Sequence, residues 1–394
     1  MDRDDGIHIH RLLLMEGGPL YRIQKAVGLG RERARITIKI ATYLPLLTWV
    51  PLLVLSAIQG TAWGSSVRMT FLGDFGAYTR FLLAIPLLLA AETVVGPLIA
   101  DAAEHFIISG VVGPKDYRAF DSAVEKALRL RDSVLAELIM LIAGYCLSVT
   151  GFKETAVEAP TWFAARTAGD ASMTLAGWWL IVFCIPLFQF LILRWLWRTF
   201  LWFQFLHRVS KLDLNLYPTH PDESGGIGFV GHAQRLFSIL LFSYSIGAVG
   251  VLANEIVYDK IPLKNFAAVI AAYVIIALIV ILAPLMVFSG KLIKLKRIGL
   301  EEYGKLGTSY TGSFHRKWIN NDPPNNDPLL GTSDIQSLAD LGNSYAMIVH
   351  MNVLPVNPRT PIQLAAASLI PLLPLLFTVM PPQDVLKLLF KVVA

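Results

Sequence analysis

One carboxylate lies midway along a long apolar run, where an ionised group is costly. Glu92 stands in the stretch 81–100, which is otherwise almost free of charge. A charged carboxylate at the centre of a bilayer costs roughly 2.5 kcal/mol or more unless it is paired, protonated or hydrated. Two interpretations therefore stay open. Glu92 binds an ion or a proton, or it is a structural acid paired with Arg194, Arg198 or Arg80.

A second group of titratable residues is expected at the inner ends of two apolar runs. Glu137 lies near the start of the run 133–151, and Asp101, Glu104 and His105 follow the preceding run. If these side chains share a pocket, they form an acidic inner vestibule suited to cations. The alternative is a solvated rim of charges at the membrane interface.

The segment 217–229 holds the densest cluster of histidine, acids, prolines and glycines in the chain. Its histidine and acids could ligate a metal or move protons, and its glycines could turn backbone N–H groups toward an anion. The alternative is a tight turn that caps the next span. The spacing matches neither a P-loop nor a full dinucleotide fingerprint. The candidate residues of this loop are Thr219, His220, Asp222, Gly225, Gly226 and Gly228.

The composition points to a membrane protein. Of 394 residues, 55% are hydrophobic and only 16% are charged, whereas soluble proteins carry roughly 25% charged residues. The net charge is +5, but the basic residues flank apolar runs, which the positive-inside rule explains better than nucleic-acid binding. No nucleic-acid partner is expected, because no known binding module is visible. Cys146 and Cys184 both fall inside apolar runs and are expected to be packing residues.

Seven apolar stretches are each close to the ~20 residues that a helix needs to cross a bilayer. Lipid leaves no alternative to helices here, because the short alternating strands of a membrane barrel are absent. The fold class is therefore all-α, a polytopic helical membrane protein with about seven transmembrane helices. Prolines in the last stretch leave open whether it crosses or re-enters. The expected spans are 38–59, 81–100, 133–151, 176–197, 233–254, 265–289 and 361–380.

The distribution of Lys and Arg predicts a cytoplasmic N-terminus. With that orientation the inner segments hold 22 of the 34 basic residues and the outer segments hold 7, a bias that normally sets topology. The last span then ends outside. The predicted organisation is a basic N-terminal segment (1–37), a six-span region (38–290) with inner loops 101–131 and 200–232, an inner helical segment (291–360), and a seventh span with its tail (361–394).

Tryptophans bracket the fourth run. Trp178 and Trp179 lie near its start and Trp195 and Trp197 near its end. The two pairs are separated by ~24–29 Å of helix, about one hydrocarbon thickness. Aromatic belts of this kind mark the two membrane interfaces. Arg194 and Arg198 are then placed to extend toward the inner headgroups.

Three further helices are expected outside the spans. Residues 12–27 form a short amphipathic helix that lies on the inner leaflet, or else a solvated basic flank. The loop 115–131 has one apolar stripe and feeds the third span. A capping box from Ser333 to Gln336 begins another helix in the inner segment. The stripe residues of the last two helices are Tyr117, Phe120, Val124 and Leu128, and Ile335, Leu338, Leu341, Tyr345 and Ile348.

Two sequence blocks carry a resemblance that covers most of the chain after the first span. One combines Arg194–Arg198 and Leu212–Asp222 with the glycine-rich stretch Gly225–Phe229, and the other is Gly331–Leu341. Together they resemble a family of bacterial multi-pass inner-membrane proteins that has no assigned activity. The resemblance implies a bacterial inner membrane as the location and says nothing about a substrate.

The favoured function is a channel or transporter for an ion or small solute, because an intramembrane acid and prolines inside spans suit a pathway. One alternative is a scaffold or signalling protein that acts through residues 291–360. The other is a membrane-embedded enzyme that uses the 219–228 loop. The expected partner is the lipid bilayer, and a homo-oligomer remains an option. The sequence identifies no cofactor, resident metal or soluble partner.

Overall fold

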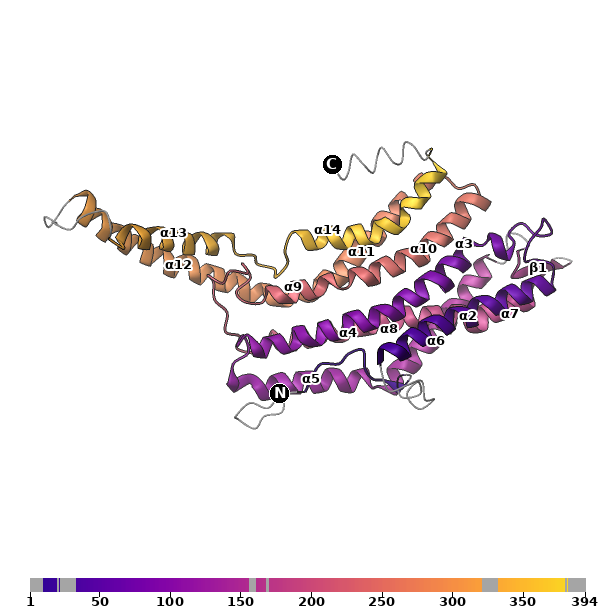
Figure 1. Cartoon of the computed structure of the whole chain (residues 1–394), viewed down its shortest axis with the longest axis horizontal. Helices are drawn as coiled ribbons and strands as arrows, with labels where there is room; N and C mark the ends of the chain where they lie inside the picture. Colours follow the sequence, from indigo (N-terminus) through magenta and orange to yellow (C-terminus); the bar gives the residue numbers. More distant parts are fainter. Residues whose placement is uncertain are drawn as a thin grey trace.

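The computed structural model describes residues 10–19, 21, 33–155, 161–167, 170–320, 332–379 and 381. In this part of the chain nearly all regular structure is helical, and the helices run side by side in an elongated bundle (Figure 1). One antiparallel pair of strands, β1 (Ala164–Thr167) and β2 (Asp170–Met173), lies at one end. The α12–α13 hairpin projects from the opposite end. The two ends are called the β-hairpin end and the α12–α13 end below.

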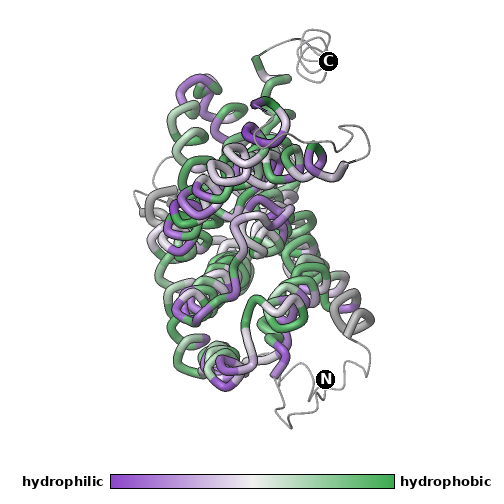
Figure 2. Tube along the Cα trace, turned by 90° about the vertical axis from the view of Figure 1, so that its left-hand side faces the viewer, coloured by the Kyte–Doolittle hydropathy of each residue, from purple (hydrophilic) through white to green (hydrophobic). Residues whose placement is uncertain are grey.

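The prediction of a multi-pass helical membrane protein is confirmed. Six helical units are long and apolar enough to cross a membrane, and the bent pair formed by α5 and α6 makes a seventh. Many apolar side chains on these helices face outward, including Val134, Ile276 and Ile279, each at least 60% exposed. Figure 2 shows long hydrophobic stretches along the helical trace, as expected for helices that cross a membrane.

Every predicted span corresponds to a helical unit in the structure. The third of them, α6, follows the amphipathic α5 after a bend of 45°. The units that contain the first four spans are α2 (Arg33–Ile58); α3 (Phe75–Ala77), η2 (Tyr78–Ala84) and α4 (Ile85–Ile108); α5 (Tyr117–Arg131) and α6 (Val134–Thr155); and α7 (Leu175–Trp179), η4 (Leu180–Cys184) and α8 (Ile185–Val209). The later units are α9 (Gly228–Arg235) and α10 (Ser238–Tyr258); η5 (Leu263–Phe266), α11 (Ala267–Leu282), η6 (Ala283–Phe288), α12 (Ser289–Phe314) and η7 (His315–Ile319); α13 (Asp334–His350); and α14 (Arg359–Leu369) with η8 (Ile370–Thr378).

The second and fourth spans share one local design. Each begins at a side-chain cap, where Asp74 accepts a hydrogen bond from the Ala77 N–H and Thr174 accepts one from the Gly177 N–H. Each then contains a π-helical segment, η2 or η4, that ends just before an Ile-Pro pair. Proline lacks the N–H that would bond to the carbonyl four residues earlier, which accounts for the wider turn ahead of Pro86 and Pro186.

Both of these units are longer than a membrane requires. They contain 34 and 35 residues, about 50 Å of helix, against a hydrocarbon thickness of about 30 Å. Their ends extend toward the α12–α13 end, where α5 packs along α8 and buries Tyr117, Phe120 and Val124. The predicted amphipathic helix at 115–131 is therefore confirmed, and it packs on protein.

The last helical unit runs the whole length of α10. It contacts α9 at its start, α10 along its course, and η5 at its end. A re-entrant segment would turn back toward the end from which it entered. The contacts at both ends therefore fit a complete crossing by Arg359–Thr378.

The sixth span continues without interruption into the α12–α13 hairpin. Leu263–Ile319 is a single helical run of 57 residues, so the boundary expected at 290 lies inside a helix. The following helix begins at Asp334 as expected, but the Ser333 side chain forms no cap hydrogen bond. Of its predicted stripe, Ile348 is buried whereas Ile335 is 47% exposed. Residues 10–18 are not helical, and most of the rest of 12–27 lies outside the described residues.

Candidate functional site

Glu92 forms a charge cluster with two arginines of α8. Its Oε1 lies 2.8 Å from Arg198 Nη1 and 3.3 Å from Arg194 Nη1. Both guanidinium groups are buried, with side-chain exposures of 3% and 6%, and Glu92 is 14% exposed. The Arg198 guanidinium also lies over the Trp195 ring, 5.6 Å from its centroid. Of the two interpretations of Glu92, the structure shows the arginine-paired acid.

The cluster corrects two expectations about depth. Arg194 and Arg198 were expected to reach the headgroups, but both are buried against Glu92. Trp195 is only 1% exposed and donates a hydrogen bond to the Leu88 carbonyl, so it lies inside the protein and forms no lipid-facing belt. Glu92 is the 18th of the 34 residues of its helical unit, Phe75–Ile108, and so lies at the middle of that unit.

The acidic vestibule does not form as expected. Asp101 and Glu104 face Arg11, whose side chain contacts both carboxylates. The His105 ring packs edge-on against Phe229, with 4.5 Å between ring centroids. Glu137 lies elsewhere, beside Gly18 of the N-terminal segment. The Arg11 side chain therefore neutralises part of this acidic surface. The surface attracts cations less strongly as a result.

Residues 10–19 form an extended strap across α4, α5 and α8. Leu12, Leu14 and Met15 are at most 2% exposed. The Met15 carbonyl accepts a hydrogen bond from Arg198 Nη2 at 3.4 Å, which ties the strap to the charge cluster. His10 Nδ1 lies 2.9 Å from Asp121 Oδ1.

The outer end of the strap contains a possible ligand set for a metal. Among the described residues, one group of three side chains places its potential ligand atoms within 4.8 Å of one another. It consists of His10, Asp121 and Glu125. His10 and Glu125 are exposed, and exposed acids commonly gather without binding a metal. The direct contact between His10 and Asp121 is explained by fastening of the strap.

In the loop 217–228, backbone N–H groups bind the carboxylate of Asp222, which belongs to the same loop. Asp222 accepts hydrogen bonds from the backbone N–H groups of Ser224, Gly226 and Gly228 at 2.9, 3.0 and 2.7 Å. Its Oδ1 also lies 2.7 Å from Nδ1 of His220. The glycine N–H groups thus surround a carboxylate, as the pattern indicated, but that carboxylate belongs to the loop itself. This arrangement caps the start of α9.

The remaining residues of the loop also have packing roles. Gly225 and Gly226 have φ of +68° and +99°, a conformation that favours glycine. Pro218 packs so closely against Gly299 of α12 that a Cβ there would lie 2.8 Å from the proline ring. The loop therefore fastens the α8–α9 connection to α12. Thr219 precedes His220 in the same turn and is partly buried.

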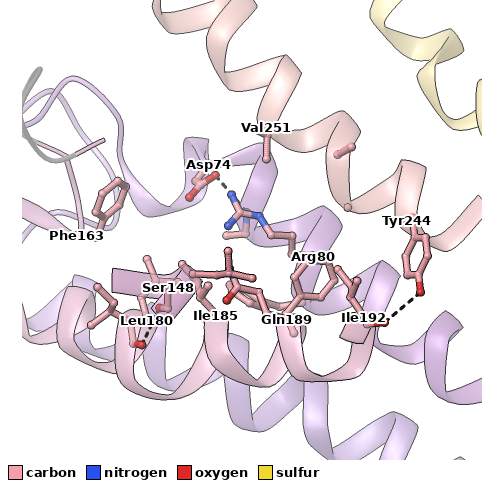
Figure 3. A pocket seen from close by; sticks show the side chains of 17 residues that line it. Asp74, Arg80, Ser148, Phe163, Leu180, Ile185, Gln189, Ile192, Tyr244 and Val251 are labelled. Carbon is pink, nitrogen blue, oxygen red and sulfur yellow. Dashed lines mark hydrogen bonds between the residues drawn. The ribbon is translucent and has the colours of Figure 1, made fainter. Parts of the chain in front are cut away.

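A cavity of about 500 Å³ lies near the β-hairpin end, between the two π-helical segments and α10 (Figure 3). Its wall is mainly apolar, with Phe81, Phe163 and Phe188 among the lining residues. This volume lies within the range of small-molecule sites in proteins. The polar side chains in the wall are Asp74, Arg80, Ser148, Gln189 and Tyr244.

Asp74, in the wall of the cavity, accepts hydrogen bonds from three parts of the chain. It is 5% exposed and accepts from Trp162 Nε1 at 3.0 Å, from Asn254 Nδ2 at 2.7 Å, and from the Ala77 N–H at 3.1 Å. The Arg80 guanidinium points toward it (Figure 3). The Asp74 carboxylate thus joins the segment before β1, the helical turn before η2 and the last part of α10.

Two polar atoms in the wall have no hydrogen-bond partner among the described residues. Among the described residues, no group forms a hydrogen bond with the buried Nε of Arg80 or with the buried Oε1 of Gln189. Ser148 and Tyr244 instead donate to the carbonyls of Ile181 and Ile192, at 2.9 and 3.3 Å (Figure 3). Buried polar atoms without partners are uncommon and call for an explanation such as a ligand or water.

No sequence pattern predicted this cavity. Arg80 was expected only as a partner for Glu92, and Asp74 and Gln189 had no predicted role. One feature of the sequence could have pointed to the cavity, because an Ile-Pro pair follows each of the two π-helical segments. The convergence of residues from four distant helices could not be seen without the fold. Compared with protein-family models, curated proteins and solved structures, the chain matches none of them.

Proposed function

We propose that this protein is a membrane transport protein for a small solute, and that the solute binds in the cavity between η2, η4 and α10. The observation that carries the proposal is the pair of buried, unpartnered polar atoms, Arg80 Nε and Gln189 Oε1, in a mainly apolar wall. Solute sites in membrane proteins typically combine a few polar groups with apolar surroundings. Glu92 has a structural part in this proposal, since its charge is already matched by arginines.

The π-helical segments support movement at the same site. A π-turn leaves backbone groups without regular helical partners and often marks a functional position. Here two such segments, each followed by an Ile-Pro pair, both contribute residues to the wall of one cavity. Two helices with interrupted hydrogen bonding at one level can bend there, which would open the cavity toward one side of the membrane.

Flux through reconstituted protein tests this function. We would measure the permeability of proteoliposomes to glycerol, acetamide, acetate and potassium ions, using protein-free liposomes as the baseline. Val251→Trp narrows the cavity, because Val251 lines it and is 40% exposed. Val269→Trp is the matched control on a lipid-facing position of α11 that is 62% exposed.

Transport predicts protein-dependent permeability to at least one of these solutes, reduced at least fivefold in Val251→Trp and unchanged in Val269→Trp. Baseline permeability to all four solutes, or equal reduction in both variants, would contradict the proposal. Both variants change one side chain at a partly exposed position, so folding can be checked by their elution as dispersed protein in detergent.

The location proposed for the protein is the bacterial inner membrane, with the α12–α13 end in the cytoplasm. The excess of Lys and Arg in the connections at that end supports the orientation. The bacterial assignment is supported by the resemblance of the Leu212–Phe229 and Gly331–Leu341 blocks. Labelling of a cysteine introduced at Ser309, in the exposed face of α12, would contradict the orientation if it occurred from the periplasm.

The α12–α13 hairpin supports a second candidate function, that of a scaffold. The hairpin extends beyond the bundle (Figure 1) and exposes apolar side chains, among them Leu306 at 53% and Ile335 at 47%. An apolar surface outside the spanning region is suited to protein contact. Loss of a co-purifying soluble protein in Leu306→Ser, with flux unchanged, would assign this role to the hairpin. The 219–228 loop supports no comparable enzymatic proposal, because Asp222 is engaged by its own backbone.

A further inference from the structure

We infer that the solute is an uncharged amphiphile, with an apolar body and one polar group that both donates and accepts a hydrogen bond, and that it enters the cavity from the lipid. Primary amides and alcohols belong to this class. The inference rests on the proposed function, since it names the substrate of the same cavity. It is carried by three features: the charge balance of the wall, the two unpartnered polar groups, and the exposed residues at the mouth.

The charge balance of the wall favours a neutral ligand. Asp74 and Arg80 are the charged residues that line the cavity, and the guanidinium points toward the carboxylate (Figure 3). The pair is therefore neutral before any ligand binds. A charged ligand would leave a net charge in a poorly hydrated site, which is costly unless a counter-charge accompanies it. An arginine in a cavity often indicates an anion, but here the adjacent acid already fulfils that role.

The unpartnered groups define what the polar end of the ligand must do. Arg80 Nε carries an N–H and can only donate, so it needs an acceptor. The terminal amide of Gln189 carries both an acceptor oxygen and a donor nitrogen, and its oxygen is buried without a partner. A single amide or hydroxyl group can accept from the arginine and donate to the glutamine. A pure hydrocarbon would leave both protein groups unsatisfied.

The mouth of the cavity faces the membrane. Leu147 of α6 and Val251 of α10 line the cavity and are 51% and 40% exposed, and Ala248 beside them is exposed as well. All three lie within spanning units. Side chains exposed at that level meet lipid, so the opening admits molecules that partition into the bilayer. A neutral molecule with an apolar body partitions well, whereas an ion does not.

Three probes with the same phenyl body separate the charge classes. They are phenylacetamide, phenylacetate and phenethylammonium, which are neutral, anionic and cationic at neutral pH. Binding of radiolabelled phenylacetamide to the full-length protein in lipid nanodiscs, after subtraction of empty nanodiscs, gives its Kd, and competition gives the other two. We expect phenylacetamide to bind at least tenfold more tightly than either ion.

Variants at Gln189 then locate the site. Gln189→Met keeps the volume but removes the amide, and should weaken phenylacetamide binding at least tenfold. Gln204→Met is the matched control, because Gln204 is on the same helix, also has a buried Oε1 without a partner among the described residues, and is outside the cavity wall. Gln189→Glu adds a negative charge to the neutral wall, and should reverse the order so that phenethylammonium competes best.

Tighter binding of phenylacetate than of phenylacetamide would overturn the inference, and so would unchanged affinity in Gln189→Met or absence of binding by all three probes. These failures differ from failure of the proposed function. If Val251→Trp still blocks flux of a charged solute, the cavity is a transport site with a different ligand class. If flux is absent while phenylacetamide binding follows the Gln189 variants, the cavity binds its ligand without transporting it.

Discussion

Arg198 Nη1 of α8 lies 2.8 Å from Glu92 Oε1 of α4, and the same arginine donates to the Met15 carbonyl of the strap. One side chain thus joins two long spans and the N-terminal segment. Because the guanidinium group is buried, the nearby Glu92 carboxylate offsets part of the cost of its charge. The contact ties α4 to α8, the two helices that continue η2 and η4.

Removal of the acid should therefore be strongly destabilising. Glu92→Gln removes the carboxylate that the buried Arg194 and Arg198 both face, and breaking a buried pair in this way costs roughly 3–5 kcal/mol. We expect a clear fall in the thermal unfolding midpoint in detergent. Glu301→Gln is the control, since Glu301 pairs with Lys305 on the exposed face of α12 and its loss should leave the midpoint unchanged. Equal midpoints for wild type and Glu92→Gln would refute the structural role.

Asp222 should stabilise the α8–α9 connection. Asp222→Ala should lower the free energy of unfolding by about 1–2 kcal/mol, as the loss of a helix cap does. Burial alone would raise the pKa of Asp222, but hydrogen bonds from Gly228, Ser224 and Gly226 and from His220 outweigh it, so the pKa lies below its ordinary value of 3.8. The contribution is therefore fully present above pH 3.8 and lost as the pH falls through the folded pKa.

Hydrogen exchange of the Gly226 and Gly228 amides measures this directly. Wild type should protect them at pH 6 and lose protection on acidification, whereas Asp222→Ala should be unprotected at both. Slow exchange of these amides in Asp222→Ala would show that the carboxylate is not what holds them.

His10 should fasten the strap in a pH-dependent way. The hydrogen bond and charge of Asp121, with a smaller effect from Glu125, raise the pKa of His10 above 6.5, against a small opposing effect of burial. A raised pKa means that the stabilisation is present below pH 6.5 and lost as the pH rises through the folded pKa. Hydrogen exchange of Leu12–Met15, corrected for its intrinsic pH dependence, should be slower in wild type than in His10→Gln at pH 5.5, and equal at pH 9. A difference that persisted at pH 9 would mean that neutral His10 holds the strap.

Gly250 should be needed for the close approach of α10 to α3. A Cβ at this position would lie 2.0 Å from Thr79 Oγ1 and 2.6 Å from the Phe75 carbonyl oxygen. One of these two atoms belongs to the backbone and cannot rotate away. Gly250→Ala should therefore lower the free energy of unfolding by about 1–3 kcal/mol, as overpacking usually does. Gly307 in α12 has nothing within 4 Å of such a Cβ, so Gly307→Ala should stabilise by roughly 0.5–1 kcal/mol. Unfolding midpoints that moved in the same direction would contradict this pairing.

Several elements were predictable because they depend on local pattern. The apolar runs predicted all seven spans, and the stripe from Tyr117 to Leu128 predicted α5, since burial of one face follows helical periodicity. The arginine partner of Glu92 was one of two open interpretations, since an acid in an apolar run needs compensation. Span ends were poorly predicted, because α4 and α8 continue past the apolar runs and pack there against Phe120 of α5.

What the sequence alone determined was the chemistry of each helix: apolar faces that require lipid or protein around them, and ionised groups that require partners. Only the tertiary structure decided which partners meet. Asp74, Arg80 and Gln189 come from separate positions in two spans, and the exposed mouth adds α6 and α10. Their convergence depends on helix register and on the two π-helical segments. These are set by contacts between residues far apart in the chain, which no local pattern records.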